Sequence, residues 1–250
     1  MSAARFAGGF LPEYARVLPR VAYRMTASLV VDPRGARRFV HDVLNGMASR
    51  LEDPVLGSCA VTDLLPGGEP VVLEGRFQLP SGSETRSLLE LAVLGHVCRS
   101  LRPAVIFEIG TFIGRTTRLL AQNAGAQCRV VTLDLPRGAV AHDVGCEFAE
   151  TPEAARIEQA EGDSSRFDFS PWRGRCDFVW VDGNHSYAFA EQDTRTALGL
   201  VRPGGWVGWH DYHPTSAWKG VTRAVRRHRA EFARIRHIRG TTIVLAQTSG

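Results

Sequence analysis

The sequence has almost no lysine, few cysteines and no long apolar run. Of its 30 basic residues, Lys219 alone is a lysine. The five cysteines are widely spaced and form no C-x-x-C pair, which argues against a disulfide framework or zinc knuckle and favours a reducing compartment. No apolar stretch approaches the roughly 18 residues that span a bilayer, and residues 1–9 lack the pattern of a secretory signal. We therefore expect a cytoplasmic protein without a membrane partner.

The composition is that of an ordinary globular protein. The chain has 250 residues, of which 44% are hydrophobic and 22% charged, enough for one full core with an appendage. The net charge is +4, but the stretch from Lys219 to Arg239 carries +7, so the remainder sums to −3. The arginines of that stretch are spread round the axis of the expected helix. Solvated surface, or steering of an anionic substrate, is therefore favoured over nucleic-acid binding.

The first 80 residues differ in character from the rest. They hold seven of the thirteen prolines and only short periodic stretches, among them an expected helix at 37–50 and an expected strand at 71–79. We expect residues 1–80 to be an irregular N-terminal extension that covers the acceptor site, followed by a regular domain from 81 to 250.

From residue 81 onward, strands alternate with helices, which predicts an α/β fold with a doubly wound, mainly parallel sheet. Helices are expected near 81–98, 115–123, 152–156, 186–201 and 221–231. Strands are expected at 104–109, 129–133, 157–160, 176–181, 206–210, 235–238 and 241–246. The last two strands, separated by little more than Gly240, should form an antiparallel hairpin at one edge.

The strongest local signal is the segment VIFEIGTFIGRTT, from Val105 to Thr117. An apolar strand runs into a glycine turn that opens a helix. Gly110 permits a tight turn and Gly114 a close approach to a ligand, although an ordinary βα turn would look similar. A nicotinamide site would want glycine where Phe112 stands, so the spacing favours a ligand without a pyrophosphate.

Two further strand ends carry carboxylates. Asp134 lies 24 residues after Gly110, where a carboxylate can accept hydrogen bonds from both ribose hydroxyls; the alternative is a loop residue that caps a turn. Asp163 and Ser164 follow the third strand, where a carboxylate can accept from an adenine amino group. A simple helix N-cap is the alternative for Asp163.

This arrangement resembles the class I S-adenosylmethionine-dependent methyltransferases over about residues 84–247. The EIG motif is similar to that of the catechol and caffeoyl-CoA O-methyltransferases. The segments FVWVDGNHSY (178–187) and GGWVGWHDY (204–212) are similar to a bacterial branch that acts on sugars and natural products. The resemblance implies a Rossmann-like seven-stranded sheet of order 3-2-1-4-5-7-6 with the last strand antiparallel, S-adenosylmethionine as cofactor, and a small-molecule hydroxyl acceptor, most simply a sugar.

The resemblance also implies roles for individual residues. Glu108, Gly110, Thr111 and Gly114 would line the cofactor loop, Asp134 would hold the ribose, and Asp163 with Ser164 the adenine. Asp182 and Asp211 match the two metal-binding carboxylates, with Asp182 also in the catalytic group, and His185 matches the proposed general base.

The side chains of Asp182, His185 and Asp211 are suited to activating a hydroxyl whether or not the family resemblance holds. A hydroxyl is a poor nucleophile until its proton leaves, and histidine titrates near working pH. A divalent cation on Asp182 and Asp211, Mg²⁺ in the first instance, would stabilise the alkoxide. His185 could instead be a helix-start residue on the pocket wall.

The chain departs from its relatives beside the second aspartate. They place a carboxylate or amide there, but this chain has His210 before Asp211 and Tyr212 after it. His210 is either a ligand of a softer metal or a histidine bonded to a backbone carbonyl. We expect His213 to be a surface residue. Trp209 or Trp218 could stack on an acceptor at the site's mouth, although core packing is favoured.

Three rival functions remain in view. The basic C-terminal segment would suit a nucleic-acid methyltransferase, but the fourth strand ends in DGNH and not in the [DN]-P-P-[YF] of base-modifying enzymes. A nicotinamide-dependent Rossmann oxidoreductase is disfavoured by Phe112. A binding protein that has lost catalysis is disfavoured by the intact Asp182, His185 and Asp211. The sequence is compatible with a homo-oligomer.

Overall fold

A computed structural model describes residues 52–67, 69–74, 82–217 and 219–250. All of these belong to the compact unit formed by residues 48–250. The helix expected at 37–50 lies outside the described residues, as do residues 75–79 of the expected early strand; residues 71–74 form no strand. In the described part of the chain, no helix is long and apolar enough to cross a membrane.

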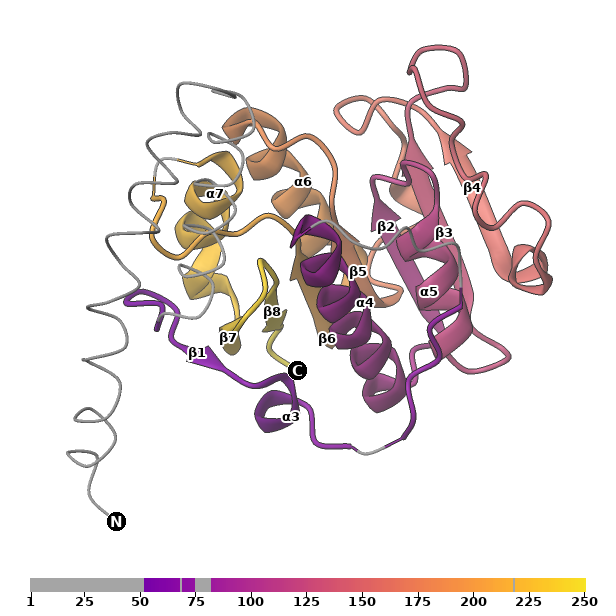
Figure 1. The fold of residues 1–250 in the computed structure, drawn as a ribbon. Helices are drawn as coiled ribbons and strands as arrows, with labels where there is room; N and C mark the ends of the chain where they lie inside the picture. Colours follow the sequence, from indigo (N-terminus) through magenta and orange to yellow (C-terminus); the bar gives the residue numbers. More distant parts are fainter. Residues whose placement is uncertain (1–51, 68, 75–81, 218) are drawn as a thin grey trace, which may run out of the picture. The chain divides into compact units, whose positions relative to one another are not determined.

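The centre of the unit is one mixed sheet. Its strands in chain order are β1 (Ser58–Cys59), β2 (Val105–Ile109), β3 (Arg129–Asp134), β4 (Ile157–Glu161), β5 (Cys176–Val181), β6 (Val201–Trp209), β7 (Arg234–Ile238) and β8 (Val244–Gln247). They lie side by side in the order β1-β7-β8-β6-β5-β2-β3-β4 (Figure 1). All neighbouring strands are parallel except where β8 pairs antiparallel with β6 and β7.

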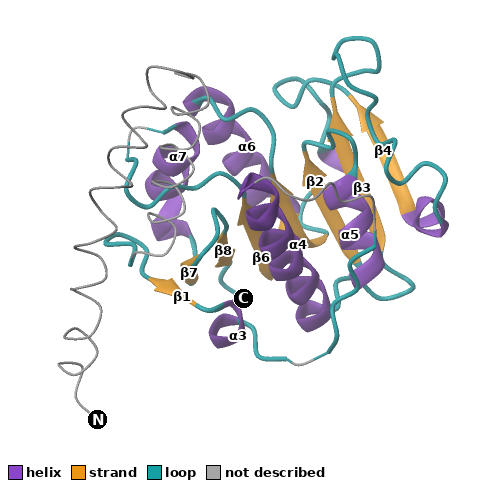
Figure 2. Ribbon diagram, in the orientation of Figure 1, coloured by secondary structure: helices purple, strands orange, loops and turns teal. Residues whose placement is uncertain are grey.

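Helices cover both faces of this sheet (Figure 2). The α-helices are α3 (Val61–Leu64), α4 (Gly82–Leu101), α5 (Arg115–Asn123), α6 (Tyr187–Leu200) and α7 (Gly220–His228). Three short 3₁₀ helices, η1 (Pro152–Arg156), η2 (Ser170–Trp172) and η3 (Arg229–Glu231), complete the described elements. Because strand side chains alternate between faces, Phe107 packs with α6 and α7, and Ile106 packs with α4 and α5.

The predicted sheet is confirmed, with one addition. Seven strands have the expected types and order, and the hairpin strand β8 is antiparallel as expected. The eighth strand, β1, comes from the predicted N-terminal extension and pairs with β7. Strand β6 begins at Val201 and ends at Trp209. The predicted strand at 206–210 therefore started too late, because Gly204 and Gly205 lie within the strand, and ended one residue too far.

Candidate functional site

The glycine turn after β2 is built on close backbone contacts. Gly110 has a φ of +103°, and a Cβ at this position would lie 2.2 Å from the carbonyl oxygen of Asp182. Gly114 is the N-cap of α5 with a φ of +86°, and a Cβ there would meet the ring of Phe148 at 2.5 Å. Only glycine fits either position without displacement. Gly110 lines the pocket described below, and Gly114 does not.

Asp134 holds this turn together. Its Oδ2 accepts hydrogen bonds from the backbone N–H groups of Thr111 (2.9 Å) and Phe112 (2.6 Å), and its Oδ1 accepts from Leu135 N–H. The Asp134 carboxylate therefore caps the turn, which was the alternative considered for it in the sequence. It also lines the pocket. The Thr111 hydroxyl is bonded to Thr132.

Glu108 lies beneath the turn and is fully buried. Its Oε2 accepts hydrogen bonds from the hydroxyls of Thr117 and Thr132, while no described group bonds Oε1. Burial raises the pKa of Glu108 to about 8, against the opposing effect of the two hydroxyls. Glu108 does not line the pocket, so it supports the glycine turn from behind.

The third strand end contributes a small turn. Asp163 and Ser164 both line the pocket. Asp163 Oδ1 accepts from Ser165 N–H at 2.8 Å, a hydrogen bond that lowers the pKa of this carboxyl. Behind the turn, the buried Asp193 of α6 has a pKa raised to about 6 by burial.

These strand ends share one cavity of about 610 Å³. That is within the range of small-molecule sites, which run from about 300 to 1,000 Å³. Its wall includes nine of the predicted site residues: Gly110, Thr111, Asp134, Asp163, Ser164, Asp182, His185, His210 and Asp211. Strand order brings them together, because the carboxyl ends of β2, β3, β4, β5 and β6 meet at one edge of the sheet.

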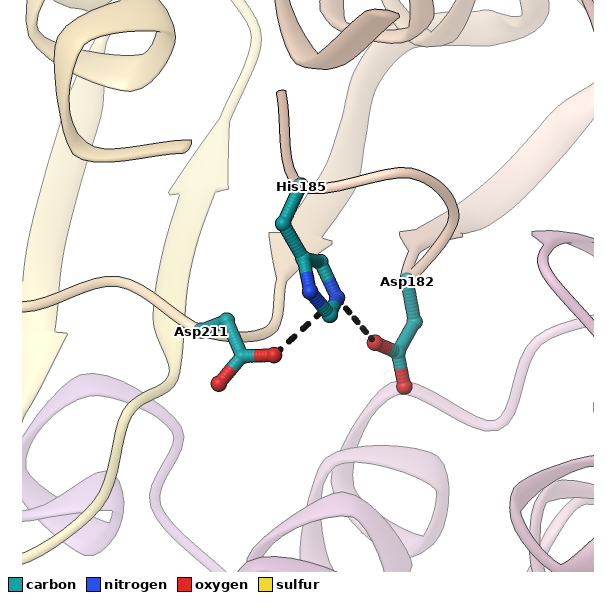
Figure 3. Close-up of side chains that lie close together, drawn as sticks. All are labelled: Asp182, His185 and Asp211. Atoms are coloured by element: carbon teal, nitrogen blue, oxygen red, sulfur yellow. Dashed lines mark ion pairs between the residues drawn. The ribbon is translucent and has the colours of Figure 1, made fainter. Parts of the chain in front are cut away.

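Asp182, His185 and Asp211 converge at this edge (Figure 3). His185 Nε2 is 3.0 Å from Asp211 Oδ2 and 3.8 Å from Asp182 Oδ1. One possible ligand atom from each residue lies within 4.8 Å of the others, a spacing that could hold a metal ion. The His185 side chain is 58% exposed, so it is open to a ligand.

His210 lies behind these residues and is tied to a residue that the sequence analysis missed. His210 Nδ1 is 3.2 Å from Asp182 Oδ1 and 3.5 Å from Asp211 Oδ2. Its Nε2 is 3.1 Å from Oε2 of Glu90, a buried residue of α4 that lines the pocket. Glu90 Oε1 accepts from the N–H and hydroxyl of Thr242. Glu90 stands alone in the apolar run from Leu88 to Leu94, and that isolation was the available signal.

The electrostatics of the cluster follow from these contacts. Burial alone would raise the pKa of Asp182, but His210 and His185 hold it below its usual value. Burial would likewise raise the pKa of Asp211, but hydrogen bonding to His210 and the charges of the neighbouring histidines together lower it. The hydrogen bond to Asp182 raises the pKa of His185 despite partial burial. Burial lowers the pKa of His210, but the neighbouring carboxylates raise it well above the usual range.

Two expectations about neighbouring residues were wrong. His213 is buried, not a surface residue, because its backbone N–H and carbonyl are both bonded to the Thr222 hydroxyl of α7. The alternative that His210 bonds a backbone carbonyl was also wrong, because His210 Nε2 contacts the Glu90 carboxylate instead. Trp209 is fully buried and donates its indole N–H to Thr194, so it packs in the core, as favoured. Trp218 lies outside the described residues.

Known proteins that share a sequence segment or the fold with this chain are methyltransferases. Residues 107–212 match a family described as a methyltransferase domain. No curated protein matches the chain. Among solved structures, the O-methyltransferase TomG from Streptomyces achromogenes, involved in tomaymycin synthesis and solved with S-adenosylmethionine, is 24% identical, with 65% of this chain and 80% of that one covered and a TM-score of 0.51.

A second solved structure has a similar fold. It is an O-methyltransferase from Bacillus cereus, 17% identical, with 76% of this chain and 95% of that one covered and a TM-score of 0.50. At these identities the likeness concerns the fold, which is that of the class I methyltransferases. The chain thus contains a segment, residues 107–212, that is similar to a methyltransferase-domain family, within a fold that it shares with O-methyltransferases.

Proposed function

We propose that this enzyme transfers the methyl group of S-adenosylmethionine to a hydroxyl oxygen of a small molecule. The observation that carries the proposal is that Asp182, His185 and Asp211 converge in the same cavity as the glycine turn and Asp134. A site for the methyl donor and a site able to activate a hydroxyl are thus joined. The five cysteines are free, consistent with the cytoplasm as the compartment.

We assign some of the site residues to cofactor binding and others to proton transfer. We assign Gly110, Thr111, Asp134 and the pair Asp163–Ser164 to the cofactor, with Asp134 on the ribose and Asp163 near the adenine. Glu108 and Gly114 shape the loop. Alignment of the acceptor oxygen with the methyl carbon can supply about 7–11 kcal/mol of the barrier.

His185 is the proposed general base. Its Nε2–H faces Asp211 Oδ2 at 3.0 Å, so the other ring nitrogen, Nδ1, accepts the hydroxyl proton while the oxygen forms a bond to the methyl carbon and the carbon–sulfur bond breaks. The sulfonium takes the bonding pair and leaves as a neutral thioether. Asp211 stabilises the imidazolium that results. A positioned base of this kind contributes about 10²–10⁴-fold to the rate.

The two aspartates fit a divalent cation. Carboxylate oxygens are the ligands that Mg²⁺ prefers, and Asp182 and Asp211 each present one within 4.8 Å of the other. The cation would bind the acceptor oxygens and stabilise the alkoxide. His210 is tethered to Glu90 and lies within 3.5 Å of both aspartates. We therefore assign His210 to support of the carboxylates in place of direct ligation.

A sugar is the acceptor we propose. The cavity wall includes the polar side chains of Asn184 and His185, which can hydrogen-bond to neighbouring hydroxyls of an acceptor. That TomG acts in the synthesis of a natural product supports a small molecule over a macromolecule.

The test is methyl transfer from labelled S-adenosylmethionine to panels of sugars, sugar-bearing metabolites and catechols, with and without EDTA. We expect transfer to a sugar hydroxyl and its loss in EDTA, with recovery on added Mg²⁺. Binding of S-adenosylmethionine without transfer to any oxygen acceptor would contradict the proposal.

His185→Ala tests the base. We expect kcat to fall by about 10²–10⁴-fold, partial rescue by added imidazole, and an unchanged affinity for S-adenosylmethionine. His96→Ala is the matched control, because His96 bonds the carbonyl of Leu65 and is not part of the cavity wall. Near-normal turnover of His185→Ala would remove His185 as the base.

A further inference from the structure

The loop that follows β6 presents Asp211 to the site in a strained conformation. Asp211 has a φ of +57°, a left-handed backbone conformation that costs about 1–3 kcal/mol for a residue other than glycine. Such a conformation persists only where neighbouring contacts hold it. The contacts that hold this loop therefore bear on where the Asp211 carboxylate lies.

Tyr212, the next residue, turns away from the cavity into the interior. It is fully buried, and its N–H donates to the carbonyl of Thr242 at 2.9 Å. The Tyr212 side chain is not part of the cavity wall. Tyr212 is thus not a ligand in this arrangement, and its hydroxyl must be explained otherwise.

The Tyr212 hydroxyl lies between the carboxylate of Asp53 and the guanidinium of Arg226. Tyr212 donates to Oδ2 of Asp53, whose side chain is completely buried. Arg226 of α7 donates from Nε to the Tyr212 oxygen at 2.9 Å, and its Nη2 lies 3.5 Å from Asp53 Oδ1. The same Nη2 donates to the carbonyl of Pro214 at 2.6 Å, farther along the loop.

Asp53 is itself fixed by the segment it belongs to. Its Oδ1 accepts from the N–H groups of Val55 and Leu56, at 2.7 and 3.0 Å. Its own N–H donates to the Ser58 hydroxyl, and Ser58 begins strand β1, which pairs with β7. The anchor is therefore continuous with the sheet.

We propose that Tyr212 is a positioning residue: its buried hydroxyl anchors the loop that carries Asp211, and it does so through Asp53 of the N-terminal segment. The segment before α4 thereby acts on the catalytic edge of the sheet from within the core. This role differs from covering the acceptor, which was the function expected for residues 1–80. The metal arm of the test below rests on the proposed function.

Tyr212→Phe and Asp53→Asn are the informative variants, because both preserve size. We expect both to lower the affinity for Mn²⁺, used as the probe cation, by about 10–100-fold, the usual effect of removing an outer support of a metal ligand. The affinity for S-adenosylmethionine should stay within about twofold. Hydrogen exchange should rise at residues 210–214 and not in the glycine turn at 110–114.

Asn123→Ala is the control for a purely structural effect. Asn123 is buried in α5 and bonds Val72 and Leu119, outside the Asp211 loop. It should lower thermal stability without the selective loss of Mn²⁺ affinity or the local rise in exchange. Calorimetry, exchange and thermal unfolding are measured on all four proteins.

The outcomes separate the two proposals. Selective loss in Tyr212→Phe and Asp53→Asn supports the anchor; losses no larger than those of Asn123→Ala, or exchange that rises equally everywhere, overturn it. If the wild type binds no Mn²⁺, the proposed metal fails. The anchor is then decided by the exchange pattern alone.

Discussion

Gly110 is the residue at which the glycine turn after β2 touches the end of β5. Its φ is +103°, and the carbonyl oxygen of Asp182 occupies the place of a Cβ. The hydrogen bond from Asp182 N–H to the Ile109 carbonyl, 2.8 Å, holds the two strand ends at this spacing. One residue without a side chain therefore sets the distance between the glycine turn and Asp182, the two places proposed to hold the methyl donor and the cation.

Gly110→Ala should abolish cofactor binding. The new methyl group must displace the Asp182 backbone, in addition to a backbone strain of about 1–3 kcal/mol. Gly138→Ala is the matched control, since Gly138 also has a positive φ, +91°, but nothing lies within 4 Å of its Cβ position. Calorimetry with S-adenosylmethionine checks this. Equal loss in both variants would show that strain, not the contact with Asp182, is responsible.

Glu108 should make stability depend on pH. In the folded protein burial raises its pKa from 4.5 to about 8, so between these values the folded state keeps a proton that the unfolded state has lost. The contribution of Glu108 to stability is therefore greatest at low pH and falls as pH rises through this window, by at most about 1.4 kcal/mol per pH unit.

Glu108→Gln replaces the titrating carboxyl by a neutral amide, so it should remove the contribution of Glu108 to the pH dependence of stability. Urea unfolding of both proteins at pH 5, 6, 7 and 8 gives the difference, in which the other titrating groups cancel. We expect the wild type to lose stability relative to the variant as pH rises. A constant difference would mean that Glu108 is ionised in the folded protein throughout.

At the scale of elements, α7 is positioned by contact with the loop that carries His185. Helices α6 and α7 lie side by side (Figure 1), and the first residue of α7, Gly220, approaches this loop closely. A Cβ on Gly220 would lie 2.2 Å from the His185 carbonyl oxygen and 2.5 Å from Tyr187 N. The start of the helix thus supports the proposed base from outside the cavity.

Gly220→Ala should therefore reduce turnover. The overpacked contact costs about 1–3 kcal/mol and shifts His185, while the cofactor turn is untouched. We expect kcat to fall at least tenfold with the affinity for S-adenosylmethionine retained. Gly199→Ala in α6, where nothing lies within 4 Å of the Cβ position, should leave turnover unchanged. Equal kcat values for the two variants would contradict the role of Gly220.

The elements themselves were largely predictable, because strands such as β2, β3 and β5 are short apolar runs and helices such as α5 and α7 have a periodic apolar face. The α5 helix has the predicted bounds, 115–123. Sequence periodicity could not show that β6 begins at Val201, since Gly204 and Gly205 are typical of a turn. Strand β1 was missed because two residues carry no periodicity.

For the molecule as a whole, the sheet order was expected from the family resemblance and confirmed. The site was predictable where a residue follows a strand, as for Asp134 and Asp182. Glu90 and Asp53 were missed because their partners are distant in sequence: His210 lies 120 positions after Glu90, and Tyr212 lies 159 positions after Asp53. No local pattern reports such pairs.

In the structure, several arginines of the basic C-terminal segment contact other side chains of the protein. Arg226 is largely buried beside Tyr212 and Asp53, Arg223 lies over the Tyr187 ring, and Arg227 is paired with Glu191. Part of the positive charge that composition suggested for a partner is thus used within the fold.

The pairing of β1 with β7 has a consequence for how the protein is made. Ser58 is aligned with His237, 179 residues later, so this edge of the sheet and the Asp53 anchor can form only after nearly the whole chain has left the ribosome. Contacts so far apart in sequence slow folding, because the loop must close before they form. A nascent chain that stops short of β7 would contain the glycine turn at 110–114 but would lack the β1–β7 pairing that fixes the Asp53 anchor.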